Sequence, residues 1–351
     1  MRATDVLLVG PAGTTGGIAQ YIQEQRRRLP RSVSARTYDV SVPTSDSIRA
    51  FAVAILLAFV QILRFPFRRR PDVVHVHSSH WNSFYQSGLY VLLASTIWRV
   101  PVVLHIHGSS FDSFMQTESK PVRLFQSVVF SQCDRVIVLS DYWRDIVGVR
   151  AAEEKITVLP NAVDPDEYDP RYDASPPHLV FISNHIERKG IKELVEAVDT
   201  LMRNDENCRV TIGGSGPLSH LAADIAERHE RVSYEGYVSE ERKREILNDS
   251  SMFVLPTYAE NLPIALLEAM AGGNVLVSTA VGAIPSLIND DNGVLVEPGN
   301  ATALAATLSD LVHDPERVEQ MAQTSRERVE QNYSWAVATE RLDDLYRELA
   351  H

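Results

Sequence analysis

Cysteine and lysine are scarce in this chain, and it contains no G-x-G-x-x-G turn. The two cysteines among 351 residues, Cys133 and Cys208, lie far apart and outside any C-x-x-C or Cys/His cluster. This spacing excludes a disulfide framework and a zinc site, and it favours a reducing compartment. The apolar run at 6–9 is too short for a signal peptide, so we expect a first buried strand there. We therefore expect a cytoplasmic protein.

Charge is unevenly distributed along the chain. The formal net charge is −12, and arginine supplies nearly all of the positive charge, since only five lysines occur. Residues 1–150 hold 17 basic and 10 acidic side chains, and the remainder holds 17 basic and 36 acidic. A basic front and an acidic back indicate that the first part of the chain meets an anionic partner. We expect no nucleic acid as that partner.

Short apolar runs alternate with helical stretches along the whole chain, which is typical of an α/β protein with parallel sheets covered on both faces. We expect two Rossmann-like, doubly wound domains that face a central cleft. The expected strands of the first sheet are 6–9, 73–77, 102–107, 135–139 and 156–159, and those of the second are 178–183, 209–213, 232–235, 252–256 and 274–278.

The domain boundary is expected where prolines and acidic residues gather, at 164–177. We predict a first domain over 1–165, a linker over 166–177 and a second domain over 178–333. A last helix over 334–351 carries an apolar stripe and is expected to pack back on the first domain. Asp164-Pro165-Asp166 spells the D-x-D pattern of some metal–diphosphate sites, but its place in the proline-rich stretch favours a linker.

The most informative segment is Tyr258–Ala269, which places Glu260 and Glu268 on either side of a proline-marked helix start. Free N–H groups at a helix start, with the helix dipole behind them, form an anion site. A glutamate on an apolar helix needs a hydrogen-bonding partner, and a sugar hydroxyl is one. An anion site with two hydroxyl acceptors suits a nucleotide sugar.

Further candidate residues follow strands. Gly16-Gly17 and Gly213-Gly214 are glycine-rich turns after strands, where the backbone can approach a phosphate or sugar. His107-Gly108 ends a strand and offers a hydrogen-bonding imidazole. His105 lies on the same expected strand as His107, and His75 and His77 end another. No carboxylate or cysteine lies at a metal-ligand spacing from these histidines, so we predict no metal site. Lys189 before Gly190 suits a diphosphate.

The segment Phe51–Arg70 allows two interpretations. Residues 51–63 are almost wholly apolar, and Arg64, Arg68, Arg69 and Arg70 follow, interleaved with two phenylalanines. Thirteen residues are too few to span a bilayer. The segment is either a buried helix of the first domain or an interfacial helix that docks on an anionic membrane.

In this order, these residues resemble the family 4 glycosyltransferases of the GT-B fold. The resemblance covers essentially the whole chain, and it rests on Glu260-x7-Glu268, Gly16-Gly17, His107-Gly108, Lys189-Gly190, the glycine turn at 213–217, Leu159–Asp164 and Tyr333-Ser334-Trp335. The resemblance implies transfer of a sugar from a nucleotide-diphosphate sugar, with retention of configuration and without a metal or cofactor. The acceptor would be a hydroxyl of a glycan or lipid-linked molecule, bound mainly by the first domain.

The resemblance also implies roles for single residues. Catalytic roles would fall to His107, Lys189 and Glu260, and donor contacts to Gly16, Gly17, Asn184, Arg188, Gly214, Tyr237, Val238, Leu262, Pro263, Ile264 and Glu268. Glu260 would contact the donor sugar, and Glu268 the ribose. The family usually has an arginine five residues before the lysine, and Asn184 stands there. Two alternatives share this scaffold: a nucleotide-sugar 2-epimerase-like isomerase, and a binding protein without chemistry.

Overall fold

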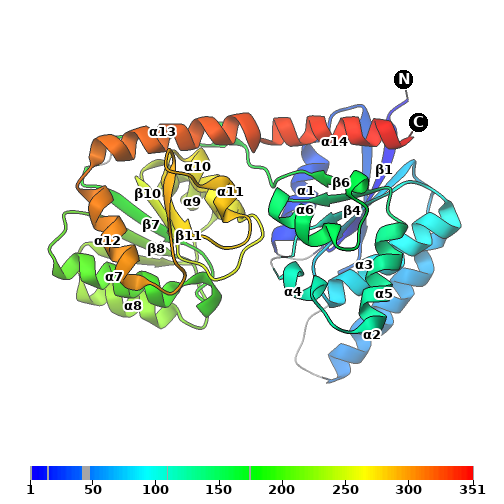
Figure 1. Ribbon diagram of the computed structural model, residues 1–351, viewed down its shortest axis with the longest axis horizontal. Helices are drawn as coiled ribbons and strands as arrows, with labels where there is room; N and C mark the ends of the chain where they lie inside the picture. Colours follow the sequence, from blue (N-terminus) through cyan, green and yellow to red (C-terminus); the bar gives the residue numbers. More distant parts are fainter. Residues whose placement is uncertain (1, 14–15, 42–47, 109, 174, 351) are drawn as a thin grey trace. The chain divides into compact units, whose positions relative to one another are not determined.

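The computed structural model describes residues 2–13, 16–41, 48–108, 110–173 and 175–350, with no side chains described at 48–52. The chain divides into two compact units. The first comprises Met1–Pro160 and Trp335–His351, and the second comprises Asn161–Ser334. Each unit holds a six-stranded sheet in which all neighbours are parallel. Figure 1 shows the sheet of each unit with helices packed beside it. The predicted α/β class, with two parallel-sheet domains, is therefore confirmed.

The first sheet has the strand order β2-β1-β3-β4-β5-β6. Its strands are β1 (Thr4–Gly10), β2 (Val33–Asp39), β3 (Val73–Ser78), β4 (Val102–Ile106), β5 (Arg135–Val138) and β6 (Ile156–Val158). The helices of this unit are α1 (Gly17–Arg28), α2 (Ile48–Arg64), α3 (Asn82–Leu93), α4 (Phe111–Met115), α5 (Lys120–Ser131), α6 (Asp141–Gly148) and α14 (Trp335–Ala350). The C-terminal α14 packs on α1, β1 and β3 (Figure 1).

The second sheet has the strand order β12-β11-β10-β7-β8-β9. Its strands are β7 (His178–Ile182), β8 (Arg209–Gly213), β9 (Val232–Gly236), β10 (Met252–Leu255), β11 (Val275–Thr279) and β12 (Gly293–Val296). The helices are α7 (Ile191–Arg203), α8 (Ser219–Arg228), α9 (Glu240–Asn248), α10 (Ile264–Ala271), α11 (Ile284–Leu287), α12 (Ala301–Val312) and α13 (Pro315–Asn332). Helix α7 packs against α8 and α12, and α10 packs against α13.

Two edge strands, β2 and β12, are absent from the sequence-based prediction. Strand β2 has only two buried residues, Val33 and Tyr38, because it lies at the edge of its sheet. Its sequence therefore lacks the continuous apolar run by which the central strands are recognised. Strand β12 has only four residues and follows Asn289–Asn292, a polar turn. Both strands close their sheets without changing the fold class.

Helix α2 is not a buried helix, and that interpretation of the segment Phe51–Arg70 is wrong. No residue of Val53–Arg64 is buried, although ten of these twelve are apolar. The short turn of Phe65–Phe67 that follows the helix anchors it to the unit, since Phe65 is fully buried, and Gln61 of the helix forms hydrogen bonds with Tyr38 and Ser41. Within the part of the chain that the structure describes, no helix is both long and apolar enough to cross a bilayer.

Residues 166–177, expected to be a linker, lie within the second unit and pack on it. Tyr168 is buried, and Pro170 and Tyr172 lie against the backbone at Gly273. The D-x-D pattern has a local role here, since the Asp164 carboxylate accepts a hydrogen bond from the Asp166 N–H at 3.2 Å. That contact caps a single helical turn, as short acidic side chains commonly do.

Candidate functional site

The second sheet reverses its strand order between β7 and β10. Strands β8 and β9 extend the sheet on one side of β7, and β11 and β12 extend it beyond β10. Ligands of open α/β sheets bind at the carboxyl ends of the strands at such a reversal. The loop after β7 carries Lys189, and the loop after β10 carries Glu260. The fold therefore brings together two predicted site residues that are 71 positions apart.

A glycine permits the two loops to meet. Gly190 has φ +73°, and a Cβ at this position would lie 1.9 Å from the carbonyl oxygen of Pro256. Only glycine tolerates both this conformation and this approach. The contact is reinforced by the Arg188 carbonyl, which accepts hydrogen bonds at 2.8 Å from the Tyr258 N–H and from the Thr257 hydroxyl. These two hydrogen bonds, one from a backbone N–H and one from a side-chain hydroxyl, hold the loop that carries Lys189.

Two positively charged side chains, those of Lys189 and Arg188, lie close to one carboxylate oxygen of Glu260. Its side chain is only 8% exposed, and Oε1 accepts from the Lys189 ammonium and from the Thr257 hydroxyl at 3.2 Å. Arg188 Nη1 lies 3.6 Å from the same oxygen and donates to the Ala259 carbonyl at 2.5 Å. Two cations are thus held at the end of β10. Thr257 was missed by sequence reasoning, because a lone threonine gives no signal.

Glu268 lies on α10 about one turn after its start and faces a different partner. Its Oε1 accepts a hydrogen bond at 2.7 Å from Lys243 on α9. Burial raises the pKa of Glu268, and Lys243 opposes that rise. Among the described residues, no hydrogen bond or ion pair joins Glu268 to Lys189 or Glu260. Nothing in the sequence pattern points to Lys243 as the partner.

Helix α10 starts at Ile264, directly after Pro263, which takes the capping position. Leu262 and Pro263 are buried, and Ile264 is half-buried. The Leu262 carbonyl accepts a hydrogen bond at 2.6 Å from the buried Asn161 side chain, which fixes the approach to the helix. In the first turn that follows, the Leu266 N–H donates to the Pro263 carbonyl at 3.1 Å, so the N–H groups that remain for an anion are those before Leu266.

The remaining predicted donor contacts of this unit lie at the same edge of the sheet. Gly214 has φ +113°, and its Cβ would lie 1.8 Å from the Ser183 carbonyl oxygen, so the turn after β8 closes on the loop after β7. Tyr237 is 82% exposed, and Val238 packs against the backbone at Gly213. Asn184 is exposed on the loop that also carries Lys189. These loops provide an open surface of backbone groups.

The first sheet has its own reversal, between β1 and β3. Gly16 and Gly17 follow β1 at the start of α1, and a Cβ at either position would meet nothing within 4 Å. Beside this turn lies a cavity of about 560 Å³, lined in part by Gly13, Arg26 and Asp39. Arg26, Arg27 and Asp39 give it two basic groups and one acidic group, a combination that the sequence pattern did not indicate.

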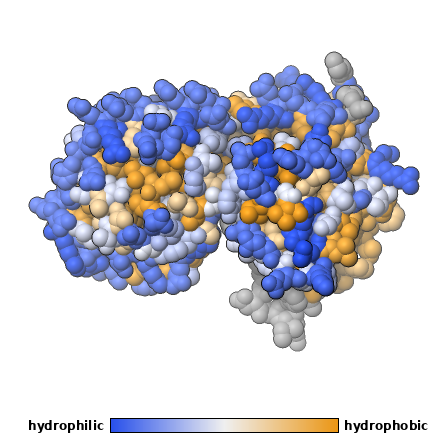
Figure 2. Space-filling view, viewed as in Figure 1, coloured by the Kyte–Doolittle hydropathy of each residue, from blue (hydrophilic) through white to orange (hydrophobic). Residues whose placement is uncertain are grey.

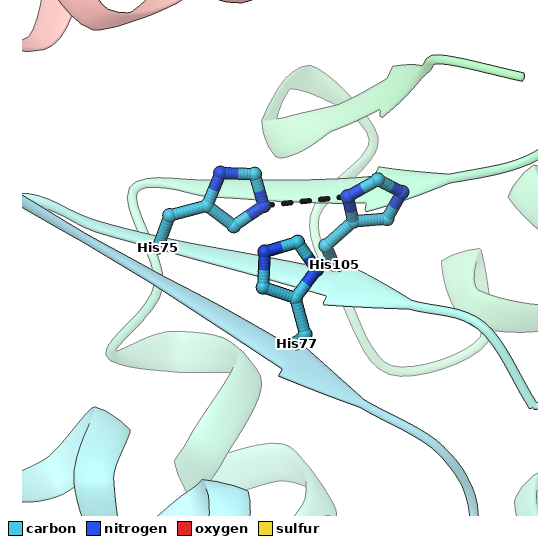
Figure 3. Close-up of side chains that lie close together, drawn as sticks. All are labelled: His75, His77 and His105. Carbon is cyan, nitrogen blue, oxygen red and sulfur yellow. Dashed lines mark hydrogen bonds between the residues drawn. The ribbon is translucent and has the colours of Figure 1, made fainter. Parts of the chain in front are cut away.

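His107 follows β4 and belongs to a stack of four histidines on the first sheet. Its Nε2 lies 3.0 Å from Nδ1 of His77, and its ring stacks on His105 at 4.1 Å between centroids. His75 Nε2 lies 3.3 Å from His105 Nδ1 (Figure 3). Burial lowers the pKa of His75 and of His107 to about 3, and it lowers that of His77 and His105 well below the usual value. All four rings are therefore neutral near pH 7.

The proton positions in this stack follow from its far end. Tyr346 on α14 lies 2.5 Å from His75 Nδ1 and accepts a hydrogen bond from Gln25 at 2.8 Å, so its own hydroxyl donates to Nδ1. His75 then carries its proton on Nε2 and donates to His105 Nδ1. A chain of hydrogen bonds thus runs from Tyr346 on α14 through His75 on β3 to His105 on β4. Sequence reasoning could not find Tyr346, since the residue lies 271 positions from His75.

The ring planes of the stack do not suit a shared metal ion. His75, His77 and His105 each have a ring nitrogen within 4.8 Å of the others, which is compatible with metal ligation by distance. However, the rings of His75 and His77 are parallel within 7° at 4.4 Å (Figure 3). A nitrogen lone pair lies in its ring plane, so an ion in the plane of one ring would lie well outside the plane of the other. The geometry favours a hydrogen-bonded stack.

Comparison with known proteins matches both units to glycosyltransferase families. The model described as "Glycosyl transferase 4-like domain" matches residues 2–162, and "Glycosyl transferases group 1" matches residues 167–328. The chain is 28% identical over 236 residues to the putative colanic acid biosynthesis glycosyltransferase WcaL of Escherichia coli, covering 63% of this chain and 58% of that protein. It is 31% identical over 225 residues to one subunit of the phosphatidylinositol N-acetylglucosaminyltransferase of Arabidopsis thaliana, covering 61% of this chain and 49% of that protein.

The chain thus spans about half the length of these curated relatives. Among solved structures, sucrose-phosphate synthase from Thermosynechococcus elongatus superposes with a TM-score of 0.79 at 18% identity over 99% of both chains. HepE of Anabaena, in complex with UDP-glucose, gives 0.75 at 15% identity over 99% of this chain and 100% of that one. These likenesses establish the GT-B fold. Together, the two family matches show that this chain belongs to the group 1, family 4-type glycosyltransferases.

Proposed function

We propose that this protein transfers a sugar from a nucleotide-diphosphate donor to an acceptor hydroxyl, with retention of the anomeric configuration. The observation that carries this proposal is the gathering of Lys189 and Arg188 around Glu260 at the strand reversal of the second unit. The group 1 match covers that unit. A solved structure of similar fold is a complex with UDP-glucose, which makes uridine diphosphate sugars the first donors to test.

The diphosphate is proposed to bind Lys189, Arg188 and the first turn of α10. An ammonium group has three donors, and the one hydrogen bond from Lys189 to a described residue goes to Glu260. The other two donors can serve phosphate oxygens. Arg188 places a second cation beside Lys189. It would therefore supply the positive charge that the family's usual arginine gives at the position of Asn184. The Gly214 and Tyr237–Val238 turns are proposed to hold the base.

Glu260 and Glu268 are proposed to bind hydroxyls of the sugar and the ribose. In each carboxylate, the described hydrogen bonds engage Oε1. Oε2 then remains as the acceptor for a donor hydroxyl in each case. The cations beside Oε1 keep the orientation of the carboxylate fixed, so that binding orders the sugar and not the protein.

The chemical step breaks the bond between the anomeric carbon and the phosphate oxygen, and the electron pair leaves with the diphosphate. The acceptor oxygen forms its bond to the anomeric carbon on the same face, and its proton passes to the departing phosphate oxygen. Lys189, Arg188 and the start of α10 stabilise the developing negative charge. These cations supply the compensation that a metal ion gives in other enzymes, so the reaction is proposed to need neither metal nor cofactor.

The first unit is proposed to bind the acceptor, a hydroxyl of a glycan or of a lipid-linked molecule, in the cytoplasm. His107 is neutral at pH 7, because burial lowers its pKa to about 3. It would therefore serve as a hydrogen-bond partner for a sugar hydroxyl and not as a charged acid. The cavity beside Gly13, Arg26 and Asp39 can admit a polar acceptor. Gly16 and Gly17 leave open space for a ligand.

Donor turnover by single variants tests the proposal. Lys189→Ala and Glu260→Gln are expected to reduce turnover by about 100-fold or more, since each removes charge stabilisation or orientation at the reacting bond. Lys192→Ala is the matched control, because Lys192 is an exposed lysine three residues further on. EDTA is expected to leave the rate unchanged, and the product anomer, read by NMR, is expected to match the donor. Near-normal turnover by Lys189→Ala and Glu260→Gln would contradict the assignment.

A further inference from the structure

Helix α2 presents an apolar face that no part of the described chain covers. Among its described residues, six large apolar side chains are 40–61% accessible: Val53, Ile55, Leu56, Leu57, Phe59 and Leu63. Several recur three or four positions apart, so they form a stripe along one side of the helix. The opposite side is tethered, since the Gln61 carbonyl accepts from the Tyr38 hydroxyl at 2.5 Å and the Gln61 side chain donates to the Ser41 carbonyl.

The apolar face continues beyond the end of α2. Phe67 is 90% exposed, and Ile97 is 55% exposed on the neighbouring turn of Ala94–Trp98. We call the residues 53–70 together with Ile97 the α2 surface. Apolar side chains gather over this part of the first unit in the lower right of Figure 2, where Figure 1 places α2 and α3. An exposed apolar area of this kind marks an interaction site.

The α2 surface ends in a cluster of arginines. Arg64, Arg68, Arg69 and Arg70 are all exposed, and no acidic residue occurs in the sequence between positions 47 and 71. Of the four, Arg69 alone has a described carboxylate within ion-pair distance, Asp5 at 3.7 Å. Arg68 lies over the ring of Tyr38 at 5.8 Å from its centroid. Apolar side chains and uncompensated positive charge therefore share one surface.

The apolar side chains and the arginine cluster together indicate which kind of partner the α2 surface can bind. A second copy of the chain docked symmetrically would bring two arginine clusters toward one interface, and like charges repel there. A lipid bilayer with anionic headgroups accepts the apolar stripe and attracts the arginines. Helix α2 has 17 residues, about 26 Å at 1.5 Å per residue, which is shorter than the hydrocarbon core of about 30 Å. Such a helix lies in the interface and does not span it.

We propose that the α2 surface docks this protein on an anionic membrane. Leu56, Phe59 and their neighbours enter the headgroup region, and the arginine cluster binds lipid phosphates. The proposal does not depend on the glycosyltransferase reaction, because neither donor nor acceptor takes part in docking. If both hold, the surface would bring the first unit to a membrane-tethered acceptor.

Vesicle co-sedimentation tests the docking without donor or acceptor present. The protein is expected to sediment with vesicles of phosphatidylcholine and phosphatidylglycerol, and much less with phosphatidylcholine alone or at high salt. Leu56→Ser/Phe59→Ser is expected to lower the partition coefficient by about tenfold or more, because two apolar side chains no longer enter the bilayer. Arg64→Gln/Arg68→Gln is expected to lower it by about 30-fold on anionic vesicles.

Two exposed residues outside the surface provide matched controls. Val149→Ser replaces an apolar side chain that is 73% exposed, and Arg203→Gln replaces an arginine that is 72% exposed in the second unit. Both should bind vesicles like the parent chain, and circular dichroism should show all variants folded. Equal binding to neutral and anionic vesicles, or unchanged binding by both double variants, would overturn the proposal. A dimer in lipid-free ultracentrifugation that Leu56→Ser/Phe59→Ser dissociates, with no vesicle binding, would identify a second copy as the occupant.

Discussion

Lys243 and Glu268 form an ion pair within the second unit, with Nζ 2.7 Å from Oε1 and side chains 14% and 11% exposed. Helix α10 is apolar around Glu268, and α9 supplies the lysine across from it. Burial disfavours the charged form of Lys243, yet its pKa is raised, because Glu268 and Glu240 lie beside it. The pair explains how a carboxylate is accommodated on a buried helix.

Lys243→Met should destabilise the second unit in a pH-dependent manner. The variant leaves Glu268 buried without its counterion, and we expect the free energy of unfolding to fall by about 3 kcal/mol near pH 8. The pKa of Glu268 is already raised by burial, and it rises further without Lys243. A carboxyl with a raised folded-state pKa stabilises the fold below its unfolded pKa and loses that contribution as pH rises. The deficit should therefore shrink toward pH 5.

Urea denaturation followed by circular dichroism at pH 5 and pH 8 measures this effect. Lys192→Met, which breaks the exposed pair with Glu187, is the control and should unfold like the parent chain at both pH values. An unchanged midpoint for Lys243→Met at pH 8 would show that the Lys243–Glu268 pair does not stabilise the unit.

The buried central strands and the strand-end motifs could be predicted from the sequence because burial on both faces leaves a continuous apolar run. Strand β8 occupies the predicted residues, and β3 extends one residue further. Edge strand β2 was not predicted, because it is only partly buried and lacks such a run. Fold class follows from the order of these runs, and it needs no side-chain detail.

The contacts within the site could not be predicted, because they join residues by tertiary structure alone. Glu260 and Lys189 were expected to share a ligand, but their direct ion pair depends on the approach of Gly190 to Pro256. Sequence periodicity also could not predict that α2 is exposed. An apolar helix has the same sequence pattern whether its apolar face is buried by the protein or left for another partner.

The histidine stack should make the first unit sensitive to acid. His75 is fully buried, and burial lowers its pKa to about 3 from an unfolded value near 6.5. A group with a lowered folded-state pKa stabilises the fold above its unfolded pKa, and this contribution is lost as pH falls. For His75 alone we expect a loss of about 2 kcal/mol between pH 7 and pH 5.

Tryptophan fluorescence can isolate this effect, because all four tryptophans of the chain belong to the first unit: Trp81, Trp98, Trp143 and Trp335. Urea denaturation at pH 5, 6 and 7 should give a shallower pH dependence for His75→Asn than for the parent chain, by up to one proton. Equal slopes for the two proteins would contradict neutral burial of His75. The absolute stability of the variant does not enter this comparison.

Gly190→Ala should damage the donor site by moving its loop. The added Cβ would lie 1.9 Å from the Pro256 carbonyl oxygen at φ +73°, so the loop must shift, and we expect a loss of at least about 2 kcal/mol in stability. Lys189 precedes this residue, and its displacement from Glu260 should weaken binding of a uridine diphosphate sugar by about tenfold or more. Calorimetric titration and thermal unfolding measure the two effects.

Gly17→Ala separates steric strain from ligand approach. A Cβ at Gly17 meets no atom within 4 Å, and the residue begins α1, so alanine should leave the melting temperature unchanged or raise it slightly. If donor affinity nevertheless falls in Gly17→Ala, the methyl group must occupy space that the ligand needs. A Gly190→Ala protein with parental stability and affinity would instead show that the loop after β7 can move without releasing Lys189 from Glu260.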